Sequence, residues 1–181
     1  MAIEYRSEPE YWEYLDGKVY PKVSPRHPHA IVQVSLAVIL RRLAGERGLV
    51  GSEFDFYVGA VDGTDTKFIP DLAFLSNERF APLSKKERDA PPLAPDIAIE
   101  VRSPSNRRRF IAKKIARYLS CGTSLVLDVD PAKRTIVAHA QDGVRAYSRD
   151  ERFQHGAVPW LTFDVAEAFE DLERSERLTL D

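Results

Sequence analysis

Two carboxylates, Asp71 and Glu100, lie in short segments whose residue patterns are typical of buried β-strands. In the first segment, 69–75, Leu72 and Phe74 share one face, and Asp71 shares the other with Ala73 and Leu75, because side chains alternate along a strand. In the second segment, 97–101, isoleucine and valine occupy one face and Glu100 points to the other. A buried carboxylate is costly without a partner or a cation. If the two segments pair as neighbouring strands, the two acids converge.

Converging carboxylates raise each other's pKa unless a divalent cation binds both. Magnesium, with manganese as the alternative, takes few protein oxygens and keeps several waters, which leaves room for a phosphate. A metal bound there would polarise a phosphodiester and lower the pKa of an attacking water. Taken singly, each acid has a structural alternative. Asp71 follows a proline, where aspartate often bonds the local backbone, and Glu100 can pair with an arginine.

The residues that follow Glu100 are strongly basic. No acid occurs between positions 101 and 127, although the chain as a whole carries a net charge of −2. Such a surface beside a metal site would attract a phosphate-bearing substrate, whereas the alternative is a solvated helix face. The basic residues are Arg102, Arg107, Arg108, Arg109, Lys113, Lys114 and Arg117.

The elements that must position these residues follow from apolar spacing, turn dipeptides and proline breaks. An apolar repeat with helical spacing is followed by Gly45 and Gly48, which we expect to end a helix. The predicted elements are a hairpin at 11–23, helices at 29–43, 84–89 and 107–119, strands at 51–60, 68–75, 97–101, 125–129 and 135–140, an edge pair after Gly143, and an amphipathic segment at 165–172. This order predicts an α/β fold around a mixed sheet.

Length and composition limit the class of protein. A chain of 181 residues with 44% hydrophobic and 30% charged residues fits one ordinary globular domain, 1–181. No apolar run is long enough to span a bilayer, and the N-terminus has no signal pattern. The single cysteine, Cys121, cannot form an internal disulfide, which agrees with a reducing compartment. The expected location is the cytoplasm.

The order and spacing of several short motifs resemble the Uma-type restriction endonuclease family, formerly a domain of unknown function, in the PD-(D/E)XK nuclease superfamily. These motifs are residues 95–106, then Lys114, Tyr118, Gly122 and 129–131, preceded by 13–18, 25–29 and Pro70-Asp71. The resemblance implies a restriction-endonuclease-like core: a mixed central β-sheet flanked by helices, with an N-terminal β-hairpin. It also implies that Asp71 and Glu100 hold the metal.

The resemblance leaves open which cation completes the site. In the superfamily a lysine two residues past the acid usually assists the attacking water, but this chain has Arg102 there. Arginine stays protonated, so it stabilises charge but accepts protons poorly. The resemblance points instead to Lys114 on the following helix, although a lysine that extends along the surface is the alternative. A further departure is Phe110, where family members often carry an acid.

The expected function is a magnesium-dependent endonuclease that hydrolyses phosphodiester bonds of nucleic acid, and DNA is the expected substrate. Asp71, Glu100, Lys114 and Arg102 are the predicted catalytic residues, and Arg107, Arg108, Arg109 and Lys113 are predicted to bind nucleic acid. The family's architecture implies a homodimer. The competing interpretation is a catalytically inactive nuclease fold that binds nucleic acid or a protein partner. Glu13, His29 and Gln33 rank lower, because solvated or structural roles are commoner for such residues.

Overall fold

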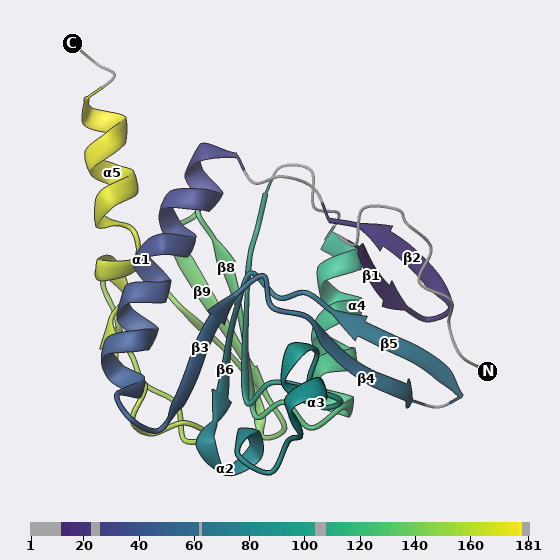
Figure 1. Ribbon diagram of the computed structural model, residues 1–181. Coiled ribbons are helices and arrows are strands. Elements are labelled where there is room, and N and C mark those ends of the chain that lie inside the picture. The colour runs from purple at the N-terminus through teal and green to yellow at the C-terminus, as the bar shows by residue number, and fades with distance from the viewer. Residues whose placement is uncertain (1–11, 23–25, 62, 104–107, 179–181) are drawn as a thin grey trace.

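A six-stranded mixed sheet forms the centre of the protein (Figure 1). The computed structural model describes residues 12–22, 26–61, 63–103 and 108–178. In sheet order the strands are β10 (Gly143–Tyr147), β9 (Thr135–Ala140), β8 (Leu125–Asp130), β7 (Ile97–Val101), β6 (Leu72–Ser76) and β3 (Gly48–Ser52). Among the strands of the described residues, only β7 and β8 pair in parallel, and α4 connects them. The predicted mixed sheet is confirmed.

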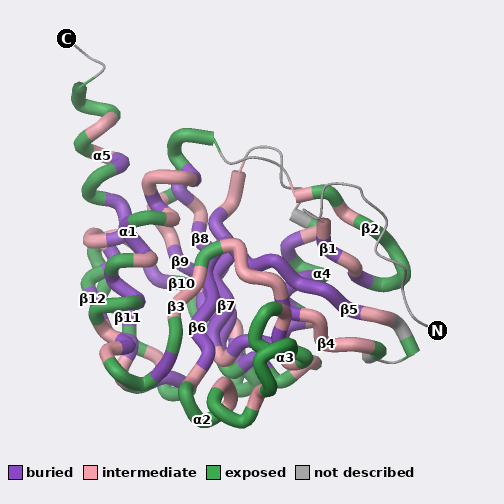
Figure 2. Tube along the Cα trace, viewed as in Figure 1, coloured by how far each residue is buried: buried purple, intermediate pink, exposed green. Residues whose placement is uncertain are grey.

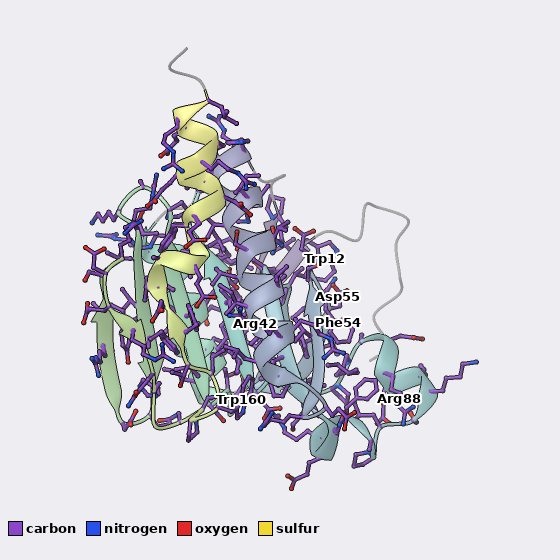
Figure 3. All side chains as sticks on the ribbon, turned by 90° about the vertical axis from the view of Figure 1, so that its left-hand side faces the viewer. Trp12, Arg42, Phe54, Asp55, Arg88 and Trp160 are labelled. Carbon is purple, nitrogen blue, oxygen red and sulfur yellow. The ribbon has the colours of Figure 1, made fainter. Side chains whose placement is uncertain are left out.

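A second, smaller sheet carries the N-terminal hairpin. Its order is β2 (Lys18–Pro21), β1 (Trp12–Leu15), β5 (Thr64–Phe68) and β4 (Phe56–Val61). The hairpin turns at Asp16 and Gly17, both with positive φ, as the Asp-Gly dipeptide predicts. Figure 3 shows Trp12, Phe54 and Asp55 on the side of the molecule away from α5.

Helices cover both faces of the central sheet (Figure 1). The helix α1 (His27–Ala44) packs on one face together with α5 (Glu170–Arg177) and the 3₁₀ turn η1 (Val165–Ala168). On the other face lies α4 (Arg108–Ser120). Shorter elements are α2 (Asn77–Phe80), α3 (Lys85–Asp89), β11 (Arg152–Phe153) and β12 (Phe163–Asp164). Among the described residues, no helix is both long and apolar enough to cross a membrane.

The strand β7 separates two apolar cores. Ile97, Ile99 and Val101 belong to the core beneath α1, whereas Ala98 belongs to the core beneath α4. Glu100 therefore points toward α4, because it alternates with Ile99 and Val101. In Figure 2, β6 and β7 are buried along nearly their whole length. A carboxylate inside such a strand needs a polar partner or an ion.

Two predicted strands are each divided into two in the structure. The expected strand 51–60 is split between β3 and β4, and Glu53 takes a positive φ of 51° at the break. The expected strand 68–75 is split between β5 and β6. Pro70 lies at this second break, where it removes a backbone donor from the ladder. Asp71 therefore lies where the chain passes from the small sheet into the central sheet.

Two helix boundaries also differ from the prediction. Gly48 begins β3 and does not close α1, which ends at Ala44. Glycine is needed at position 48 because a Cβ there would lie 2.2 Å from the Leu75 carbonyl oxygen of β6. Pro28 lies within the first turn of α1, where its missing N–H costs nothing. The C-terminal segment predicted at 165–172 is a 3₁₀ turn followed by α5, which continues to Arg177.

Candidate active site

The strands β6 and β7 bring Asp71 and Glu100 together. They pair antiparallel with Leu72 opposite Ile99, so one further step of the register places Asp71 across from Glu100. The Val101 N–H donates to Asp71 Oδ2 at 2.7 Å, which extends this pairing beyond the strand end. Asp71 is 3% exposed and Glu100 is 2% exposed. The convergence expected from adjacent strands is therefore present in the backbone.

A cavity of about 50 Å³ opens beside the two carboxylates. A single buried water needs roughly 10–15 Å³ of such space, so the cavity has room for a few waters. The elements β1, α1, β7 and α4 contribute to its lining. The ionisable residues among the ten that line it are Glu13, Lys22, His29, Asp71, Glu100 and Lys114.

Glu100 is held from α4. Lys114 Nζ lies 2.6 Å from Glu100 Oε1, and the Tyr118 hydroxyl donates to the same oxygen at 2.9 Å. Both residues project from one face of α4, because positions four apart in a helix are neighbours. Burial raises the pKa of Glu100 to about 7, and the attraction of Lys114 only partly opposes this. Glu100 thus holds its proton more readily than Asp71, whose pKa is lowered.

Lys114 lies between two carboxylates. Its Nζ contacts Glu13 Oε1 at 2.7 Å as well as Glu100, and its side chain is 2% exposed. Burial would lower the pKa of this ammonium, but the surrounding carboxylates of Glu100, Glu13 and Asp71 outweigh that effect and raise it. The alternative of a surface lysine is wrong for Lys114. Its fixed positive charge faces the cavity.

Glu13 belongs to this cluster, although the sequence favoured a solvated hairpin glutamate. It is 3% exposed, and its Oε1 also accepts from the Ile69 N–H at 2.9 Å. The detectable signal was the alternation within β1, since Glu13 shares its strand face with the buried Leu15. The position of Glu13 on the inward face of its strand indicates a site more strongly than its position beside a turn indicates exposure to solvent.

Asp71 has its own lysine, Lys22, which the sequence analysis missed. Lys22 Nζ lies 2.7 Å from Asp71 Oδ1 and donates to the Ile69 carbonyl oxygen at 2.6 Å. Burial would raise the pKa of Asp71, but the positive charges of Lys22 and Lys114 help to outweigh it and lower the pKa. Strand alternation could have revealed Lys22, because it follows Tyr20 at a spacing of two.

The first turns of α1 also reach Asp71. The Gln33 side-chain amide donates to the Asp71 carbonyl oxygen at 2.9 Å, and His29 Nε2 lies 3.5 Å from Asp71 Oδ2. Burial lowers the pKa of His29, which the charge of Asp71 only partly offsets. The other ring nitrogen of His29 is buried without a hydrogen-bond partner among the described residues. The helical spacing of His29 and Gln33 thus directs both toward the same aspartate.

Contacts with α4 hold the hairpin over the cavity. Arg117 and Lys113 both pair with Asp16 in the hairpin turn, at 2.7 Å and 3.1 Å. The Tyr20 ring packs on Phe110 with centroids 4.4 Å apart. The hairpin supplies Glu13 directly and leads into Lys22, so these contacts fix two of the ionisable groups.

The remaining predicted residues lie elsewhere. Arg102 forms a bidentate pair with Asp128 at 2.7 and 2.5 Å and is not among the described residues that line the cavity. Arg109 is exposed on α4, and Lys113 is exposed beside Asp16. Arg108 begins α4. Arg107 lies outside the described residues.

The cavity carries more acid than base. Three carboxylates face two lysines, and the lowered pKa of His29 favours its neutral form, so one negative charge is left uncompensated unless a proton or a cation joins it. Among the described residues, no three His, Cys, Asp or Glu side chains are arranged to hold a metal ion. A pair of carboxylates beside a water-sized space is nevertheless the donor set that Mg²⁺ takes, because Mg²⁺ keeps several of its waters. Asp71 and Glu100 fit that requirement.

The chain belongs to the Uma2 family, described as "Putative restriction endonuclease", which matches residues 2–173. Its fold resembles the crystal structure of a "putative nuclease belonging to DUF820" from Anabaena variabilis ATCC 29413. The two share 21% identity with a TM-score of 0.79, over 91% of this chain and 93% of the other. No curated protein matches the chain at a significant level. Family and fold together support a nuclease and confirm the restriction-endonuclease-like core.

Proposed function

We propose that this protein is a divalent-metal-dependent endonuclease that hydrolyses phosphodiester bonds of DNA. The observation that carries the proposal is the pair of buried carboxylates, Asp71 and Glu100, side by side across β6 and β7 at a cavity with surplus acid. A protein has little reason to bury surplus negative charge unless a cation or a proton joins it. Membership in a family described as nucleases supports the cation.

In this proposal Asp71 and Glu100 hold Mg²⁺, with Mn²⁺ as an effective substitute. When bound, such an ion polarises the phosphodiester and lowers the pKa of the attacking water. Lys114 keeps its proton beside Glu13 and Glu100. It therefore serves as a fixed positive charge that stabilises the charge developing on the phosphate, and it does not act as a base. Glu13 is a positioning residue, because it holds Lys114.

The substrate side of the proposal rests on α4. Arg109 and Lys113 are exposed on this helix, whose buried face carries Lys114 and Tyr118 into the cavity. Contacts from such residues to backbone phosphates would orient DNA without reading its sequence. A homodimer, with one site for each strand, follows from the family's architecture. Arg102 is still predicted to stabilise the charge on the phosphate, but its guanidinium would have to do so while it is paired with Asp128.

The test is cleavage of supercoiled plasmid and of single-stranded DNA in Mg²⁺ or Mn²⁺, with EDTA as the blank. We expect Asp71→Asn and Glu100→Gln each to slow cleavage by roughly a hundredfold or more, the effect of losing about 2.7 kcal/mol of transition-state stabilisation. Asp128→Asn is the matched control, because Asp128 is equally buried on the strand next to β7. Cleavage by Glu100→Gln at the parent rate would refute the proposal.

One observation favours the second candidate, a nuclease fold that binds nucleic acid without cutting it. Each carboxylate of the pair already has a lysine on it, Lys22 on Asp71 and Lys114 on Glu100. Duplex binding that needs no metal, weakens with salt and leads to no cleavage in Mg²⁺ or Mn²⁺ would establish this candidate.

A further inference from the structure

Both oxygens of Asp71 are engaged by groups of this chain. Oδ1 accepts from the Lys22 ammonium at 2.7 Å, and Oδ2 accepts from the Val101 N–H at 2.7 Å. His29 Nε2 approaches Oδ2 at 3.5 Å. The backbone contact belongs to the pairing of β6 with β7, so it is fixed by the sheet. Lys22 is therefore the only one of these donors with a formal charge and a long, rotatable side chain.

A divalent cation and an ammonium group on one carboxylate oxygen repel each other. Mg²⁺ binds carboxylate oxygen at about 2.0–2.1 Å and Lys22 Nζ lies 2.7 Å from Asp71 Oδ1, so the two cations would lie at most about 4.8 Å apart. Two positive charges at such a distance repel strongly, most of all where water is scarce. A metal on Asp71 Oδ1 consequently competes with the Lys22 ammonium, and its binding favours the departure of Lys22.

We propose that Lys22 is a resident cation that closes Asp71 until a divalent ion displaces it, and that the displaced ammonium then binds a phosphate of the nucleic acid. This inference rests on the proposed function, since it assumes that Asp71 is a metal ligand. Lys22 would make metal and substrate binding mutually supportive, because the metal releases the group that the phosphate binds. The affinity for metal in the absence of nucleic acid would be lower, because the metal must first displace the Lys22 ammonium from Asp71.

The two lysines of the cavity differ in their freedom to move. Lys114 Nζ is 2% exposed and lies between Glu13 and Glu100, so moving it would strip both carboxylates of their cation. The Lys22 side chain is 11% exposed and contacts one carboxylate and one backbone carbonyl, that of Ile69. Lysine is a compact charge on a flexible four-carbon stem. Lys22 can therefore turn toward the cavity opening while its backbone stays in place.

Calorimetry with Mn²⁺ alone tests the exchange. We expect Lys22→Gln to bind Mn²⁺ roughly tenfold more tightly than the parent, because the competing ammonium is gone; that change equals about 1.4 kcal/mol. Lys18→Gln is the matched control, since Lys18 is exposed on β2 and its loss changes the net charge equally. An unchanged or weaker affinity in Lys22→Gln, with the parent binding, overturns the exchange and leaves the proposed function standing. If neither protein binds Mn²⁺, both are wrong, whereas binding by Lys22→Gln alone supports the exchange.

Acylation of lysines in the unaltered protein gives a second readout that needs no variant. We expect Mg²⁺ to raise the labelling of Lys22 by an amine-reactive ester severalfold, as measured by peptide mass spectrometry, and a short DNA duplex to reverse the increase. Labelling of Lys18 should not respond to Mg²⁺. Lys22 labelling that stays constant while Mg²⁺ binds would show that the ammonium does not leave Asp71.

Discussion

Glu100 and Asp128 are neighbours with nearly identical burial and different surroundings. They are register partners on the parallel strands β7 and β8, and they are 2% and 3% exposed. Asp128 receives a bidentate guanidinium from Arg102, whose remaining nitrogen reaches Asp130 at 3.4 Å. Glu100 shares one ammonium with Glu13 and faces the cavity.

The difference shows that burial of a carboxylate does not by itself mark a site. The Asp128 pair is a bidentate structural ion pair, the geometry in which Arg is strongest. In the Glu100 cluster two buried carboxylates share one ammonium and a cavity lies beside them, so an ion has both a reason and room to bind. Variants that alter one cluster at a time should separate stability from function.

Lys114→Met should give the largest loss of stability. The change leaves the buried carboxylates of Glu13 and Glu100 without their shared cation, and breaking a buried pair in this way costs about 3–5 kcal/mol. Urea denaturation at pH 8 measures the loss. The double variant Lys114→Met/Glu13→Gln should recover part of it, because one of the two uncompensated charges is removed. A single variant as stable as the parent would mean that Lys114 does not neutralise these acids.

The pH dependence of stability should separate Glu100 from Asp128. Folding raises the pKa of Glu100 from 4.5 to about 7, so the folded protein keeps a proton that the unfolded chain loses in between. The stabilising effect is therefore complete below pH 4.5 and declines as pH rises to about 7, by about 3 kcal/mol in total at about 1.4 kcal/mol per pKa unit. Asp71, whose pKa is lowered from 3.8, affects the pH dependence of stability only below pH 4.5.

Glu100→Gln should remove this decline, as shown by denaturation curves measured between pH 4.5 and pH 8. Asp128→Asn should leave the decline in place. If the parent and Glu100→Gln depend on pH in the same way across this range, the carboxyl of Glu100 is ionised at neutral pH and its proton does not neutralise the surplus charge.

Arg102→Met should destabilise less than Lys114→Met. The change leaves Asp128 buried without its guanidinium, but the Arg102 side chain is 29% exposed and water can replace part of the contact. We expect a loss of about 1–3 kcal/mol, in the range for an unpaired buried polar group. Plasmid cleavage that persists near the parent rate would assign Arg102 to structure, whereas a hundredfold slower rate would restore its predicted catalytic role.

The sequence predicted some of the ionisable residues of the cavity and not others, and the residues that it missed have a common cause. Asp71, Glu100 and Lys114 were predicted from strand alternation and the family's motif order, and the structure brings them together. Glu13 was ranked low and Lys22 was missed because both come from the small sheet, which crosses over the cavity. That crossing depends on the break at Pro70, which divides one expected strand between two sheets. Periodicity within a strand cannot reveal which second sheet covers it.

Tyr118→Phe should lower stability less than Lys114→Met and have the most specific effect of these variants. The Tyr118 hydroxyl donates to Glu100 Oε1 at 2.9 Å, and both groups are buried. Its removal costs a hydrogen bond to a charged acceptor, roughly 1.5–3 kcal/mol at high pH. The loss should shrink below pH 7, because a protonated Glu100 accepts that bond less strongly. It should also raise the pKa of Glu100, since a donor that favours the carboxylate is gone.

The control for Tyr118→Phe is Tyr147→Phe. Tyr147 belongs to the core on the other face of the sheet, and its hydroxyl donates to the backbone carbonyl oxygen of Gln154. Its loss of stability should not change between pH 5 and pH 8. A matching, pH-independent loss in Tyr118→Phe would show that the hydroxyl senses no ionisation of Glu100. The surplus charge of the cavity would then have to be assigned to Glu13 or Asp71, and the distinction between the Glu100 and Asp128 clusters would rest on the cavity alone.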